Sequence, residues 1–229
     1  MRRQAPAIAA GRSHSVARRG DGTVLAVGSD AGGECRVGGW DDVVAVAAGN
    51  VHTANNTGRS HTVGLRSDGT VVAAGWNGDG QCDTCGWRGV TAVAAGWRRT
   101  LGLLADGTVA ATGRRSEGQC DVSSWRDVVG ISCGDWHSVG VRADGTTVAV
   151  GVNRRRQCSV EQWRDVLTVA AGYLHTLALT SDGRVLATGD QTLGTCGVSN
   201  RQDLWMACFT QPGGHLVDLD RWFVRPVVR

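Results

Sequence analysis

Short apolar runs alternate with glycine-rich and polar segments along the chain, and their lengths predict β-strands. Toward the C-terminal end the runs are Val166–Ala171, His175–Leu179 and Val185–Gly189. Runs of this length match a typical strand and are too short for a typical helix. Asp182 and Gly183 separate the second run from the third, and their tolerance of positive φ predicts a tight hairpin turn. We therefore expect an all-β protein.

This pattern recurs in a common register. The markers are the Asp-Gly dipeptides beginning at Asp21, Asp68, Asp106, Asp144 and Asp182, the cysteines Cys35, Cys82, Cys120, Cys158 and Cys196, and the tryptophans Trp40, Trp87, Trp125 and Trp163. Successive copies lie 38 residues apart, except that the first step is 47 residues. The nine extra residues read as a small duplication in one loop, because His52-Thr53 is repeated as His61-Thr62.

Each repeat contains three clear strands, and the segment around Gln119–Val122 predicts a weaker fourth. A small sheet of this kind must stack on its neighbours, and a period near 40 residues indicates a β-propeller. We predict one propeller domain over residues 1–229, with about six four-stranded blades. The repeats run approximately over 5–40, 41–87, 88–125, 126–163, 164–201 and 202–229, and the last is degenerate because Phe209-Thr210 replaces Ala-Gly and no Asp-Gly turn follows.

The string Ala-Ala-Gly-x-x-His-Thr-x-x-Leu-x-x-Asp-Gly-x-Val-x-x-x-Gly, followed by Gly-Gln-Cys, resembles the repeat of the regulator of chromosome condensation family. The resemblance extends over roughly residues 5–201 and is weak beyond them. It implies a β-propeller. It does not select a function, because similar propellers include an exchange factor for a small GTPase, a plant ultraviolet-B photoreceptor and a bacterial inhibitor of β-lactamases.

The repeats differ most in two loops, which join strands one and two and follow strand three. Because antiparallel strands alternate in direction, both loops should lie on one rim, opposite the Asp-Gly turns. Loops on a rigid scaffold commonly bind, and Trp, Tyr and Arg are enriched at interface hot spots. The predicted binding residues are Trp76, Trp97, Arg98, Arg114, Arg115, Asp135, Trp136, Arg154, Arg155, Arg156 and Tyr173.

Composition narrows the class of partner. All 24 basic residues are arginine, which we attribute to codon bias in a GC-rich, bacterial genome, and the net charge of +3 is too small to indicate nucleic acid. No apolar run approaches the roughly 20 residues of a membrane span, and Met1–Gly11 lacks a secretory apolar stretch. We expect a cytoplasmic, non-catalytic protein that recognises a protein or peptide of acidic character, without a cofactor.

Histidine and cysteine are the residue types that could bind a metal or react, but both recur at a fixed position of the repeat. His14, His61, His137 and His175 share one position, which Arg99 takes in the third repeat. Their separation around the ring favours a hydrogen bond that holds a turn over a metal site, so no metal site is predicted. The repeated cysteines are expected to be buried free thiols, which suit a reducing compartment.

The sequence is also compatible with three other functions. The protein could bind a small molecule, or act as an enzyme of a bacterial biosynthetic pathway at the channel mouth, with Asp135, His137 and Asp190 as candidates. It could regulate a small GTPase as an exchange factor does. It could also be an assembly unit, because an exposed strand edge in the irregular last blade would favour a homodimer.

Overall fold

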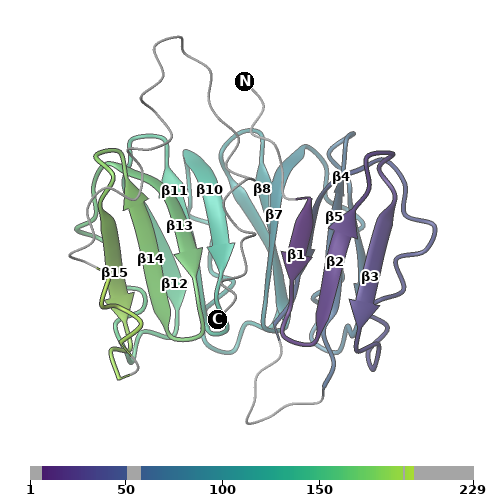
Figure 1. Ribbon diagram of the computed structural model, residues 1–229. Coiled ribbons are helices and arrows are strands. Elements are labelled where there is room, and N and C mark those ends of the chain that lie inside the picture. Colours follow the sequence, from purple (N-terminus) through teal and green to yellow (C-terminus); the bar gives the residue numbers. More distant parts are fainter. Residues whose placement is uncertain (1–6, 51–57, 193, 199–229) are drawn as a thin grey trace, which may run out of the picture.

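The computed structural model describes residues 7–50, 58–192 and 194–198, which form five antiparallel sheets of three strands each (Figure 1). Each sheet consists of three consecutive strands in chain order, so the middle strand pairs with both neighbours. The strands are β1 Ile8–Ala10, β2 His14–Arg18, β3 Val24–Gly28, β4 Val43–Ala48, β5 His61–Arg66, β6 Val71–Gly75, β7 Val90–Gly96, β8 Arg99–Leu104, β9 Val109–Gly113, β10 Val128–Cys133, β11 His137–Arg142, β12 Thr147–Gly151, β13 Val166–Ala171, β14 His175–Thr180 and β15 Val185–Gly189.

The all-β prediction is confirmed, but the predicted fourth strand is absent from these sheets. After β6, for example, the chain makes successive turns instead of a strand. Gln81 accepts a hydrogen bond through Oε1 from the Asp79 amide at 3.1 Å, and Asn77 Oδ1 accepts one from the Cys82 amide at 2.7 Å. Side chains thus occupy backbone donors that a fourth strand would need. The sixth predicted repeat, 202–229, and most of the duplicated loop lie outside the described residues.

The sheets follow one another in a propeller-like array, in which each first strand packs against the preceding sheet. Thus β4 packs on β1 and β2, and β7 on β4 and β5. The repeat tryptophans lie at these junctions. Trp40 lies so close to Gly64 that a Cβ there would come within 2.9 Å of its ring, and Trp87 lies over Gly102 in the same way. A glycine therefore accepts the indole of the preceding repeat.

A buried hydrogen-bond relay joins neighbouring sheets at the repeat histidine. His61 Nε2 lies 3.0 Å from Thr100 Oγ1, and the same hydroxyl donates to the Gln81 carbonyl at 2.8 Å. Because the hydroxyl proton goes to a carbonyl, the histidine must donate from Nε2. Equivalent relays run from His14 through Thr62 to the Glu34 carbonyl and from His137 through Thr176 to the Gln157 carbonyl. The predicted hydrogen bond is therefore present, but it joins two sheets and does not merely hold a turn.

A glycine beneath each repeat histidine is required by the imidazole ring. It lies three residues before His14, His137 and His175, and 12 residues before His61 because of the nine extra residues in that loop. A Cβ at Gly49 would lie 2.5 Å from His61 Nδ1, and one at Gly134 would lie 2.6 Å from His137 Cε1. Real Cβ atoms do not approach other atoms so closely, so only glycine fits beneath the imidazole. The Gly-x-x-His pattern is thus one steric unit.

Arg99 replaces histidine in the third repeat and makes a larger set of contacts. Its fully buried guanidinium donates to Ser138 Oγ at 3.0 Å, to the Asp135 carbonyl at 2.9 Å and to the Gly134 carbonyl at 2.7 Å. It also donates to the His137 carbonyl. The longer side chain therefore preserves the link to the next sheet while adding bonds to its turn.

Hydrogen bonds also confirm that the two variable loops of a repeat share one edge, which we call the variable edge (bottom of Figure 1). The Trp76 amide donates to the Ser60 carbonyl at 2.8 Å, and the Arg114 amide donates to the Arg98 carbonyl at 2.9 Å. At the opposite edge, the Val128 amide bonds the Gly107 carbonyl of an Asp-Gly turn at 3.0 Å. The dissimilar loops are therefore gathered on one side of the array.

The relay predicts a specific loss of stability in mild acid. Burial lowers the pKa of His61 to about 4 and that of His137 to about 3, and in both cases the charge of Arg99 contributes. Below about pH 6.5 the unfolded chain binds protons that the native relay excludes, so the free energy of unfolding should fall as pH decreases from 7 to 5, by up to about 1.4 kcal/mol per pH unit and histidine.

A His137→Gln variant retains an N–H donor for Thr176 but does not titrate. Urea unfolding of the variant should give lower stability at pH 7 and a shallower pH dependence than wild type. An unchanged slope between pH 7 and pH 5 would contradict the assignment of His137 as a buried neutral donor.

Candidate binding surface

Indole and guanidinium groups alternate in a cluster on the variable edge. The Arg98 Cζ lies 4.4 Å from the Trp76 ring centroid and 4.9 Å from that of Trp97. The Arg114 Cζ lies 4.8 Å from the Trp97 centroid and 5.8 Å from that of Trp136. The Trp97 and Trp136 rings are 4.5 Å apart at 57°. We call these five residues the Trp/Arg cluster; its spacings are typical of cation–π and tilted aromatic contacts.

Three neighbouring sheets supply the cluster. Trp76 directly follows β6, and Arg114 directly follows β9. Trp97 and Arg98 form the two-residue turn between β7 and β8, and Trp136 immediately precedes β11. All five lie in the loops where the repeats differ in sequence. The strands, which all repeats share, therefore bring together side chains that are particular to these three repeats.

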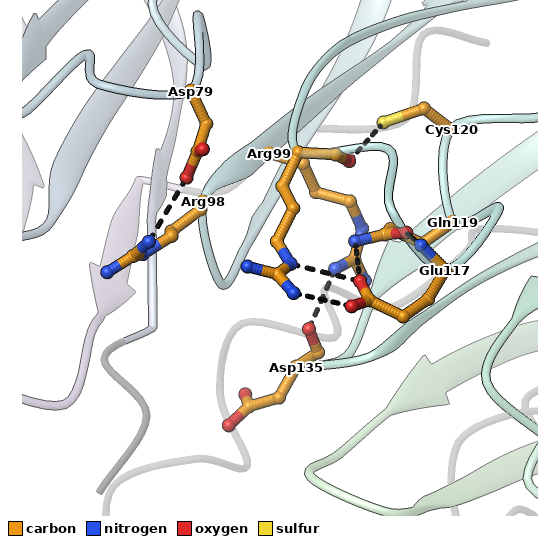
Figure 2. Close-up of polar contacts among 8 residues, drawn as sticks. Asp79, Arg98, Arg99, Glu117, Gln119, Cys120 and Asp135 are labelled. Carbon is orange, nitrogen blue, oxygen red and sulfur yellow. Dashed lines mark hydrogen bonds and ion pairs between the residues drawn. The ribbon is translucent and has the colours of Figure 1, made fainter. Parts of the chain in front are cut away.

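Acidic side chains neutralise both arginines of the cluster. Arg98 pairs with Asp79 at 3.3 Å, and Arg114 Nε donates to Glu117 Oε2 at 2.9 Å. The pair with Arg114 lowers the pKa of Glu117 to about 2, and the same hydrogen bond raises the pKa of Arg114. Figure 2 shows Arg98 directed toward Asp79, and Glu117 also accepting from the Gln119 amide. The cluster is therefore rigid and close to electrically neutral.

Two of the predicted binding residues are buried. Trp97 is 3% exposed and Asp135 is 7% exposed. Asn50, from the loop after β4, donates to Asp135 Oδ1 at 3.0 Å, so this bond links the second and fourth sheets. Figure 2 shows the Asp135 carboxylate directed away from Arg99, which the residue contacts through its backbone oxygen. These residues support the surface more than they form it.

The exposed predicted residues flank the cluster on the third, fourth and fifth sheets. They are Arg115, Arg154, Arg155, Arg156 and Tyr173. Arg155 Nε lies 3.6 Å from Asp190 Oδ2. Arg115, Arg154 and Arg156 form no ion pair within the described part of the chain. Positive charge available to a partner is thus concentrated beside the neutral cluster.

Arg156 also adopts an uncommon backbone conformation. Its φ is +66°, in the left-handed region. The corresponding residues of the other four repeats are glycines with φ between 68° and 88°, namely Gly33, Gly80, Gly118 and Gly194. Outside glycine, the described residues with positive φ are three aspartates and two arginines, Arg98 and Arg156. Comparing the repeats at this position would have identified Arg156 from sequence alone, because glycine suits that conformation and arginine does not.

The candidates for catalysis have separate partners. Asp135 bonds Asn50, His137 bonds Thr176, and the Asp190 carboxylate accepts from Thr192. No group of three or more potential metal ligands gathers within the described residues. Burial raises the pKa of Cys82 and Cys158 to about 12, so their thiols are poor nucleophiles. No helix able to cross a membrane occurs in this part of the chain.

Comparison with solved structures shows the fold. Prp20p from Saccharomyces cerevisiae aligns with 20% identity and a TM-score of 0.62, over 81% of this chain and 57% of that one. The same yeast protein bound to Kap60 gives 20% identity and a TM-score of 0.62, over 81% and 56%. Human WBSCR16 gives 20% identity and a TM-score of 0.64, over 86% and 64%. The chain thus spans less than two thirds of the length of each.

Sequence comparison identifies the repeat. No curated protein matches the whole sequence significantly. The profile described as "Regulator of chromosome condensation (RCC1) repeat" matches residues 56–81, 90–119 and 166–199, in register with three of the observed sheets. Three segments of the chain are thus similar to the regulator of chromosome condensation repeat, and the described sheets share the fold of the yeast structure.

Proposed function

We propose that the variable edge binds a protein or peptide that carries acidic side chains, and that it does so without catalysis. Structures of this fold are described with protein partners: Prp20p with Gsp1p and histones, and the same protein bound to Kap60. Those partners belong to Prp20p and support only the general class of function. Exchange-factor-like regulation of a small GTPase is a narrower form that the family resemblance implies.

The conformation of Arg156 is the observation that carries the proposal. A non-glycine residue in the left-handed region costs about 1–2 kcal/mol. Four of the five corresponding residues avoid this cost by being glycine. Strain of this kind concentrates at functional sites. We infer that the Arg156 guanidinium is retained because it contacts a ligand.

Charge on the surface gives the chemistry of that ligand. Arg98 and Arg114 already pair with Asp79 and Glu117, so the Trp/Arg cluster provides shape and rigidity more than charge. Arg115, Arg154 and Arg156 remain exposed around it. Arginine forms bidentate hydrogen bonds with carboxylates, which suits side chains of aspartate and glutamate.

Replacing Arg156 by glycine should separate binding from stability. The Arg156→Gly variant should be about 1 kcal/mol more stable in urea unfolding, because glycine removes the strain. It should bind a fluorescein-labelled glutamate-rich peptide roughly 3–10-fold more weakly in an anisotropy titration at 50 mM salt, a typical loss for one charge-assisted contact.

Arg164→Ala is the matched control, because Arg164 is exposed but adjoins the Asp-Gly turns of the opposite edge. It should leave the peptide affinity unchanged. Equal affinities for wild type and Arg156→Gly, or an equal loss in the Arg164→Ala control, would refute an acid-binding variable edge. A variant with stronger binding but lower stability would refute the strain argument as well.

The supporting role of Trp97 gives an independent prediction. Trp97→Ala should lower the free energy of unfolding by about 3–5 kcal/mol, because it removes a buried indole on which two guanidiniums and a second indole pack. Arg115→Ala, at an exposed position of the same edge, should change it by less than about 0.5 kcal/mol. Urea denaturation followed by far-ultraviolet circular dichroism measures both, and equal stability of the two variants would show that the cluster is not a packed unit.

A further inference from the structure

The turn between β10 and β11 carries Trp136 and is held by a side chain from the neighbouring sheet. The Arg99 guanidinium donates to the Gly134 carbonyl at 2.7 Å and to the Asp135 carbonyl at 2.9 Å. It also donates to the His137 carbonyl. Figure 2 shows the contact between Arg99 and Asp135. One fully buried cation therefore binds three carbonyls of this turn and fixes the backbone from which Trp136 projects.

The other repeats show that these bonds are additional to the sheet junction. Histidine holds the position of Arg99 in the other four described repeats, and His61 donates to a single hydroxyl, that of Thr100. Arg99 makes the equivalent contact from Nε to Ser138 Oγ at 3.0 Å, and this hydroxyl donates to the Gln119 carbonyl. The junction thus needs one donor, and the three bonds to carbonyls serve the turn.

The Trp/Arg cluster offers a partner apolar surface more than charge. Arg98 and Arg114 are already paired with acidic side chains. Trp97 is 3% exposed, whereas Trp76 and Trp136 are only half-buried. Indole surface that remains in contact with water favours an apolar side chain of a partner, because that contact removes apolar area from water.

Exposed cations lie in the loop next to Trp136. The Val152 amide donates to the Trp136 carbonyl at 3.0 Å, which places Trp136 beside the loop that follows β12. This loop carries Arg154 and Arg156, which are exposed and form no ion pair within the described part of the chain. The variable edge therefore presents apolar surface and available guanidiniums on the same sheet.

We propose that the variable edge takes a peptide in which an apolar side chain lies between acidic ones. The apolar side chain packs on the Trp136 indole, and the acidic side chains pair with the exposed arginines of the adjacent loop. Arg99 is the positioning residue, because its bonds to the turn hold the Trp136 indole against Trp97. This inference rests on the proposed function and names the class of peptide more closely.

The partner is tested with two fluorescein-labelled glutamate-rich peptides that differ in one central residue, leucine or serine. Wild type should bind the leucine peptide about 5-fold more tightly in an anisotropy titration at low salt, because the leucine side chain leaves water on the indole. Equal affinities would overturn the apolar contact and leave acid binding intact. Binding of neither peptide would refute the proposed function itself, and this inference with it.

Variants of the turn test the role of Arg99. Arg99→His keeps a donor for Ser138 but loses the bonds to carbonyls, so its preference for the leucine peptide should fall to about 2-fold or less, as in Trp136→Ala. The double variant should show the same preference as Trp136→Ala, because the two residues act through one contact. Full preference in Arg99→His would overturn the positioning role.

Ser138→Ala is the matched control. It removes the hydroxyl that contacts Arg99 and Gln119 at the same junction but leaves the bonds to carbonyls in place. It should lower the melting temperature and retain the preference for the leucine peptide. An equal loss of preference in this control would show that any weakening of the junction abolishes it, which would refute a specific role of Arg99.

Ultraviolet circular dichroism tests the orientation of Trp136 without a peptide. The Trp97 and Trp136 rings, 4.5 Å apart, should give an exciton couplet that Trp136→Ala removes. Arg99→His should weaken this couplet, and Ser138→Ala should leave it unchanged. An unchanged couplet in Arg99→His would overturn the positioning role whatever the peptides do.

Discussion

The relay from histidine through a hydroxyl to a carbonyl is the interaction on which the array depends. A three-stranded sheet of this size cannot bury both faces, so its stability lies in the junction with the next sheet. At three of the junctions between described sheets the imidazole donates to a hydroxyl that in turn donates to the preceding repeat, as His61, Thr100 and Gln81 show, and Arg99 takes the place of the imidazole between the third and fourth sheets. The imidazole Nε2 of His61 and the hydroxyl of Thr100 find these partners only when the two sheets are in place, so the relay makes the junction specific.

Sterics couple this relay to the rest of the repeat. The imidazole excludes any side chain at the glycine beneath it, and the repeat tryptophan excludes one at the glycine of the next sheet. Gly49 and Gly64 are therefore glycine because His61 and Trp40 leave no room for a side chain there. The repeated histidine, tryptophan and glycine residues are thus explained by the junctions. The loops outside the junctions can differ in sequence from one repeat to the next.

The variable edge combines a packed, neutral cluster with exposed, charged arginines. Trp97 and its neighbours form a neutral, packed cluster whose arginines are paired with Asp79 and Glu117. Around it, exposed arginines keep their charge available, and Arg156 does so in a strained conformation. A rigid support beside unpaired cations limits the ordering cost of binding an acidic ligand, since little of the surface must be fixed on contact.

The sequence alone determined the repeat, its register, the all-β class and the gathering of dissimilar loops at one edge. These follow from local properties of the chain, which Val166–Gly189 illustrates: the lengths of the apolar runs, the Asp-Gly turn and the alternating direction of antiparallel strands. It also predicted a structural role for the repeat histidines, because a residue that recurs once per repeat has copies separated around the ring.

Tertiary structure decided what depends on partners distant in the chain. A weaker fourth strand was predicted around Gln119–Val122, but at the matching place in the second repeat Gln81 accepts a hydrogen bond from a backbone amide that such a strand would use. Trp97 and Asp135 looked like surface residues, yet contacts with other sheets bury them. The charge balance of Arg98 and Arg114 likewise depends on where Asp79 and Glu117 fold back. Spacing along a chain reports the local backbone, whereas burial and ion pairing are set by neighbours that only the folded array brings within reach.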